Sequence, residues 1–139
     1  MGSLETLKIQ WVLPTPAYNK YVCYPEFLGH YNDFPQHTER REEFFLNSYN
    51  LHLIFGGEGY VFHEGERIRM GKGSGFLYPR GAYQQYGSDV SEPWDVRWVH
   101  FRTEISLPLL EEVDQSRGYF FTFDLNAGLE PIFDEMYRL

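Results

Sequence analysis

The chain has 139 residues, of which 42% are hydrophobic and 19% aromatic, enough apolar material for one globular domain with its own core. Its 20 acidic and 12 basic residues give a formal net charge of −8, so this chain alone is not expected to bind DNA, whose phosphates it repels. The single cysteine, Cys23, excludes an internal disulfide, and we interpret it as a buried, inert thiol. No apolar run approaches the about 20 residues of a membrane helix, and the N-terminus lacks the pattern of a signal peptide. We therefore expect a soluble, cytoplasmic protein without a membrane partner.

The first twenty residues lack the period of a helix. Trp11, Pro14 and Pro16 follow one another without a repeat, and proline interrupts regular structure. We expect residues 1–20 to form an extended N-terminal arm that lies over the domain.

Residues 21–103 have the pattern of short strands. The 12 Phe, 11 Tyr and 3 Trp favour strands because flat rings pack well on a pleated surface. In the clearest strand, residues 49–55, one face carries Asn50, His52 and Ile54, and the other carries Tyr49, Leu51, Leu53 and Phe55. Further strands are predicted at residues 21–24, 60–63, 67–70, 75–78 and 94–101. A strand roughly every ten residues is typical of a β sandwich or barrel.

In residues 104–139 the apolar residues recur at the spacing of a helix. A first short helix is predicted from Leu107, Leu109, Leu110 and Val113. Asn126 is the predicted N-cap of a second helix, whose apolar stripe consists of Leu129, Ile132, Phe133, Met136 and Tyr137. The stripe reaches Leu139 without a stop signal, so we expect the natural chain to continue beyond this residue.

Three stretches carry a resemblance to a known family. Residues 73–87, Gly-Ser-Gly-Phe-Leu-Tyr-Pro-Arg-Gly-Ala-Tyr-Gln-Gln-Tyr-Gly, combine a glycine turn, an apolar strand and a proline-glycine corner, and residues 93–101 end in Trp-Val-His-Phe. With Gly57-Glu58-Gly59-Tyr60, they resemble the N-terminal ligand-binding and dimerisation domain of AraC-family transcriptional regulators, over roughly residues 21–139.

The resemblance implies a fold and a domain organisation. The fold would be mainly β, a cupin-type double-stranded β-helix (jelly roll) with one or two C-terminal α-helices. The ligand-binding barrel would span residues 21–103 and a truncated helical dimerisation region residues 104–139, while the helix-turn-helix DNA-binding domain would be absent from this chain.

Many cupins are metal enzymes, so the metal positions of that fold decide between two functions. By the resemblance, the metal-ligand positions fall near Phe44, Leu46, Asn50 and Gln84, and a shift of one residue would bring in Phe45. None of these is a usual ligand of a divalent metal. We expect no metal, no cofactor and no enzymatic activity.

The resemblance also implies which residues line the barrel. The candidate ligand-binding residues are Arg41, His52, Gln84, Tyr86 and Trp98. On the last strand, Trp94, Val96, Trp98 and His100 would point inward, and Asp95 and Arg97 outward. Val96 stands where the arabinose-binding member of the family has a histidine, which argues against arabinose itself. Each candidate also has a structural reading: Arg41 lies in a charged run typical of a solvated surface, and the inward side chains could simply fill the core. We interpret His63 and His100 as structural or surface groups.

Together, these features predict that the chain senses a small molecule. The leading hypothesis is an effector-sensing domain that binds a sugar or glycoside, in a homodimeric bacterial transcription regulator that contacts DNA only through its missing domain. Leu129, Ile132, Phe133 and Met136 are candidates for the dimer interface, unless they only cover the sheet. A metal-dependent cupin enzyme and a freestanding carbohydrate-binding module are the alternatives.

Overall fold

The computed structural model describes residues 6–13, 23–103 and 107–138. The strands are β1 (Leu7–Val12), β2 (Cys23–Asn32), β3 (Thr38–Arg41), β4 (Tyr49–Gly56), β5 (Glu58–His63), β6 (Glu66–Gly71), β7 (Ser74–Tyr78), β8 (Gln84–Ser88), β9 (Asp95–Thr103) and β10 (Tyr119–Thr122). The helices are α1 (Pro108–Ser116) and α2 (Leu129–Tyr137). Neither of these nine-residue helices is long and apolar enough to cross a membrane.

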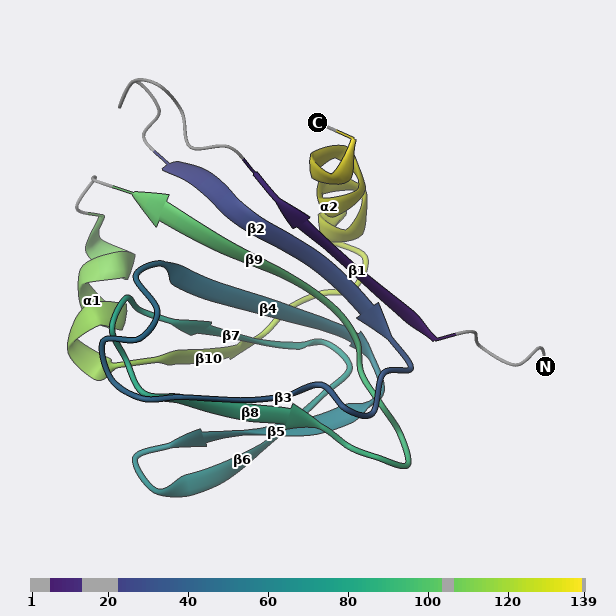
Figure 1. Cartoon of the computed structure of the whole chain (residues 1–139), viewed down its shortest axis with the longest axis horizontal. Helices are drawn as coiled ribbons and strands as arrows, with labels where there is room; N and C mark the ends of the chain where they lie inside the picture. The colour runs from purple at the N-terminus through teal and green to yellow at the C-terminus, as the bar shows by residue number, and fades with distance from the viewer. Residues whose placement is uncertain (1–5, 14–22, 104–106, 139) are drawn as a thin grey trace.

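Two antiparallel sheets face each other across the core. The six-stranded sheet has the order β1-β2-β9-β4-β7-β10, and the four-stranded sheet has the order β3-β8-β5-β6. Figure 1 shows the second sheet below the first, with α2 on the outer side of the six-stranded sheet and α1 at one end of the sandwich. This mainly β arrangement with two C-terminal helices confirms the predicted fold class.

The alternation in β4 places its side chains as predicted. Asn50, His52 and Ile54 are buried between the sheets, whereas Leu51 and Leu53 belong to the apolar cluster under α2. Across the β4–β9 pair, His52 lies opposite Trp98 and Asn50 lies opposite His100. Because side chains opposite each other on antiparallel strands share a face, these four side chains stack in layers inside the barrel.

The outer face of the six-stranded sheet is covered by α2. Phe133 is buried against Leu28, Leu53 and Val99, and Leu129, Met136 and Tyr137 also pack on this cluster. Three of the four candidate dimer residues therefore cover the sheet of their own chain, while Ile132 remains 53% exposed.

Arg97 points out of the barrel, as expected, but it is only 7% exposed. Its Nη1 lies 3.7 Å from Glu130 on α2 and 3.5 Å from Asp95, and its guanidinium lies 4.9 Å from the ring centre of Phe55. The outward face of β9 is thus a second buried layer rather than a solvated one.

Several local features differ from the sequence predictions. Leu7–Val12, within the expected arm, pairs with β2 as an edge strand. The region expected to be helical also contains the strand β10, which pairs with β7. The sequence did not predict this strand, because four residues are too few to show a period. The N-cap of α2 is Gly128, at a φ of 81°, and not Asn126, whose backbone N–H donates to Asp124 2.9 Å away. Cys23 is exposed at the start of β2, so its prediction as a buried thiol is wrong.

Candidate ligand-binding site

A cavity of about 230 Å³ opens between the two sheets. Its lining combines aromatic, hydrogen-bonding and charged side chains, namely Gln10, Phe27, Tyr31, His37, Glu39, Arg41, Phe45, Leu46, His52, Tyr86, Trp98 and His100. The volume lies below the about 300–1,000 Å³ of sites for drug-sized ligands, so the cavity suits a small molecule.

The strand registers show which residues lie at the bottom of the cavity and which lie above them. Ile54 and Val96 are opposite each other and fully buried in the core, beneath the layer of His52 and Trp98. Val96, which the resemblance placed at a ligand-contact position, does not line the cavity.

A hydrogen-bond network fixes one wall around Tyr86. Nη1 of Arg41 donates to Oη of Tyr86 at 2.7 Å and to Oε1 of Gln84 at 3.4 Å. Nδ2 of Asn50 donates to the same two oxygens, at 3.1 and 2.9 Å respectively. Burial raises the pKa of Tyr86, and the nearby Arg41 guanidinium offsets part of that rise, so the phenol is protonated at neutral pH. Because its oxygen already accepts two hydrogen bonds, its own proton can be donated to a ligand.

Three histidines share the lining, and all three are neutral at physiological pH. Burial, with Arg41 nearby, lowers the pKa of His37 and of His100 to about 3. Burial, followed by the proximity of His37 and His100, lowers the pKa of His52 well below its usual value. A neutral imidazole offers one N–H donor and one bare nitrogen acceptor. The histidines therefore present both donors and acceptors without charge.

Buried polar atoms at this site lack hydrogen-bond partners among the described residues. They are Nδ1 of His37, both ring nitrogens of His52, Nε1 of Trp98, Oδ1 of Asn50 and Nε2 of Gln84. Buried polar groups in folded proteins are hydrogen-bonded in about nine cases of ten, so a cluster of exceptions calls for an explanation. A ligand with several hydroxyl groups would satisfy the atoms that line the cavity.

The structure brings four of the five predicted site residues together. Arg41, His52, Tyr86 and Trp98 line the cavity, whereas Gln84 is fully buried and bonded to Arg41 and Asn50. Their role in binding stays a prediction.

Sequence reasoning missed other lining residues. His100 is buried and lines the cavity, so it is not a surface group; its inward strand phase was the signal. His37 precedes β3 in a turn, where no strand phase could reveal its direction. Phe45 lies in the loop between β3 and β4, where the sequence also offers no period.

The residues at the metal positions of the cupin fold do not fit a metal. Phe44 and Phe45 are exposed, and Nδ2 of Asn50 donates a hydrogen bond to Oε1 of Gln84. Within the part of the chain that the structure describes, no group of three or more His, Cys, Asp or Glu is arranged to hold an ion.

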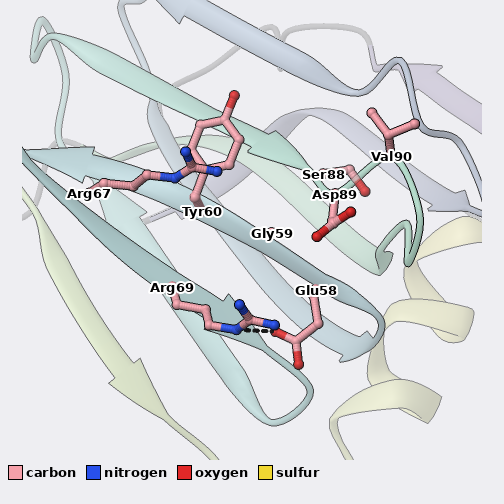
Figure 2. Close-up of a pocket in the computed structure, with 8 residues that line it drawn as sticks. All are labelled: Glu58, Gly59, Tyr60, Arg67, Arg69, Ser88, Asp89 and Val90. Carbon is pink, nitrogen blue, oxygen red and sulfur yellow. Dashed lines mark hydrogen bonds and ion pairs between the residues drawn. The ribbon is translucent and has the colours of Figure 1, made fainter.

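A second, larger hollow of about 460 Å³ lies over the outer face of the four-stranded sheet. Figure 2 shows Arg69 directed at Glu58, with Nε of Arg69 3.2 Å from its carboxylate, and Arg67 across the ring of Tyr60, at 4.4 Å. Arg69 thus pairs with Glu58 and Arg67 with the ring of Tyr60, and the hollow contains none of the unpartnered buried atoms. The inner cavity is thus the stronger candidate for a ligand.

A jelly roll with a small, mixed polar and aromatic cavity between its sheets defines the class of cupin-like domains. The family model "AraC-like ligand binding domain" matches residues 24–139, and the chain belongs to this family.

Three known proteins are similar to the chain. It is 33% identical over 114 residues to the MmsAB operon regulatory protein of Pseudomonas aeruginosa, a match that covers 77% of this chain and 34% of that protein. The chain thus spans about a third of that relative's length. YhaK from Escherichia coli superposes with a TM-score of 0.61 at 11% identity, over 86% of this chain and 52% of YhaK. Apo ToxT K231A from Vibrio cholerae superposes with a TM-score of 0.58 at 15% identity, over 84% of this chain and 48% of ToxT. At these low identities, the two solved structures share the fold.

Proposed function

We propose that the chain is the effector-sensing domain of a transcription regulator and that its effector is a small, uncharged, polyhydroxylated molecule, a sugar or glycoside. The observation that carries the proposal is the set of unpartnered polar atoms on His37, His52 and Trp98 in a cavity of about 230 Å³. These residues provide donors, acceptors and a flat indole face within one small space.

The chemistry of the lining matches hydroxyl groups. A hydroxyl donates one hydrogen bond and accepts two, so it complements both nitrogens of a neutral imidazole. The indole of Trp98 supplies a donor and an apolar face against which the C–H side of a sugar ring can pack.

The charge of the lining favours a neutral ligand. Among the described residues that line the cavity, the cation is Arg41, which already donates to Tyr86 and whose Nη2 lies 3.6 Å from the carboxylate of Glu39. An anionic ligand would have to compete with Glu39 for this guanidinium, whereas a hydroxyl does not.

A route from the cavity to α2 supports a role in signalling. Trp98 packs directly on Gly29 of β2, where an added Cβ would lie 2.1 Å from the indole. The carbonyl of Gly29 accepts a 2.9 Å hydrogen bond from Oη of Tyr137 on α2. Movement of Trp98 on ligand binding would therefore shift Gly29 and alter how α2 packs on the six-stranded sheet. In the regulator that we propose, α2 passes this change to a homodimer partner and to a helix-turn-helix DNA-binding domain outside this chain.

A thermal-shift screen of monosaccharides, disaccharides and uronic acids, each with a chelator and with divalent metals, tests the proposal. A ligand that binds only the folded chain raises its melting temperature by mass action. We expect a neutral sugar or glycoside to stabilise the chain equally with and without chelator. Stabilisation by a metal alone would contradict the proposal and favour the cupin-enzyme alternative.

A further inference from the structure

The mouth of the cavity differs chemically from its interior. Phe45, in the β3–β4 loop, lines the cavity yet is 74% exposed, so the cavity opens to solvent beside this ring (Figure 1 shows the loop at the left end of the sandwich). Leu46, the next residue, and Phe27 of β2 also line the cavity. These three side chains contain no polar atom, whereas the unpartnered polar atoms of the lining residues belong to His37, His52 and Trp98.

The loop holds Phe45 in place at the mouth. The backbone N–H of Phe44 donates to the Gly81 carbonyl at 2.9 Å, and the Gly81 N–H donates to the Leu46 carbonyl at 2.8 Å. The residues on both sides of Phe45 are thus tied to the β7–β8 connection. Phe44 has a φ of 67°, a left-handed conformation that residues other than glycine adopt rarely and that tends to persist at functional positions. The backbone therefore keeps an aromatic ring in solvent beside a polar cavity.

We infer that the effector is a glycoside with a flat, apolar aglycone: its sugar ring occupies the inner cavity, and its aglycone contacts Phe45 at the mouth. This inference rests on the proposed sugar-sensing function and narrows it to one class of effector. A free sugar would satisfy the inner polar atoms but would leave the Phe45 ring exposed to water. An aromatic aglycone would cover the ring, because offset or edge-to-face ring pairs attract beyond their buried area.

The ligand itself, rather than a second protein copy, is the occupant that the geometry favours. Phe45 and Leu46 are continuous with the cavity that contains the polar sites, so one amphipathic molecule can reach both regions. A protein partner seated on Phe45 would instead cover the opening of that cavity.

Matched methyl and phenyl glycosides of common monosaccharides, in both anomers, test the inference by calorimetric titration. For the sugar that binds, we expect the phenyl glycoside to bind about tenfold more tightly than the methyl glycoside, the upper range of one aromatic pair. In the Phe45→Ala variant, this preference should fall below about threefold, because the affinity for the phenyl glycoside falls more than the affinity for the methyl glycoside. Phe44→Ala, which removes the neighbouring exposed ring that does not line the cavity, is the matched control and should keep the preference.

The outcomes separate the two proposals. Equal binding of methyl and phenyl glycosides by the unaltered chain, or a phenyl preference that survives Phe45→Ala, would overturn the aglycone site while leaving sugar sensing intact. If Phe45→Ala instead changes the mass measured by light scattering without altering the preference, the ring contacts a second copy and the inference is wrong. Absence of binding by every sugar and glycoside would overturn the sensing function and, with it, this inference.

Discussion

At the scale of the residue, Trp98 connects the cavity to the rest of the fold. Its indole faces His52 across the β4–β9 pair, and its Nε1 lacks a partner among the described residues. The indole also contacts the rings of Tyr31 and His100, and it packs on Gly29, where an added Cβ would clash with it. A single side chain thus provides the stacking face, a hydrogen-bond donor and the link to β2.

Trp98→Ala should therefore weaken effector binding at least tenfold, or about 1.4 kcal/mol. Trp98→Phe keeps a ring in place but removes the indole N–H, so it should lose less affinity and separates stacking from hydrogen bonding. Titration of the sugar selected by the thermal screen measures both variants. Unchanged affinity in a folded Trp98→Ala chain would remove this residue from the site.

At the scale of the element, β2 must contain glycine at position 29. A Cβ there would lie 2.1 Å from Cε2 and Cζ2 of Trp98, so Gly29→Ala forces the indole to move. We expect a loss of about 1–3 kcal/mol in the free energy of unfolding, as for overpacked cores, together with weaker effector binding.

Gly56→Ala is the matched control, because an added Cβ there meets only Cβ of Asp95, at an ordinary 3.5 Å. Urea denaturation measures the free energies of unfolding, and titration measures binding. Equal effects of the two substitutions on both quantities would show that close packing of Trp98 on Gly29 is not required.

The apolar face of α2 stabilises its own chain. Phe133 is 4% exposed against Leu28, Leu53 and Val99, so Phe133→Ala should cost about 3–5 kcal/mol of unfolding free energy. Ile132, exposed on the same helix, should cost less than about 0.5 kcal/mol when replaced by alanine. Chemical denaturation distinguishes them, and similar losses at the two positions would mean that α2 does not pack as described.

The elements that sequence reasoning predicted well are those with a visible period. The alternation of residues 49–55 placed Asn50 and His52 inside the barrel, and the family resemblance gave the inward phase of β9. β3 escaped prediction because its sequence, Thr-Glu-Arg-Arg, has the composition of a solvated surface. Pairing with β8 nevertheless brings Arg41 opposite Gln84 and beside the cavity. Such long-range pairing, like the turn that directs His37 inward, leaves no local signal in the chain.

At the scale of the whole molecule, the buried histidines make stability depend on pH. The pKa values of His37 and His100 are about 3 in the folded chain, and that of His52 is also well below normal, against about 6.5 in an unfolded chain. Between pH 6.5 and 3 the unfolded chain therefore binds protons that the folded chain does not. Linkage then requires the free energy of unfolding to fall as the pH falls through this window, with no contribution from these groups above it.

Each such histidine should add up to about 1.4 kcal/mol per pH unit to the slope. Carboxylates also contribute in acid, so the comparison with His100→Gln isolates one histidine. We expect the variant to lose stability less steeply between pH 6 and about 4 in chemical denaturation. Parallel slopes for the two proteins would show that His100 is not buried in its neutral form.

The proposed function requires that a sugar occupy the cavity between the sheets. The indole N–H resonances of ¹⁵N-labelled protein test this directly, because Nε1 of Trp98 lacks a partner among the described residues, whereas Nε1 of Trp94 donates to the Met70 carbonyl at 2.9 Å. On titration with the sugar or glycoside selected by the thermal screen, the Trp98 resonance, assigned with Trp98→Phe, should shift strongly while that of Trp94 stays nearly fixed. A Trp98 resonance that stays in place at saturation would show that the ligand binds elsewhere, and the proposed binding site would be wrong.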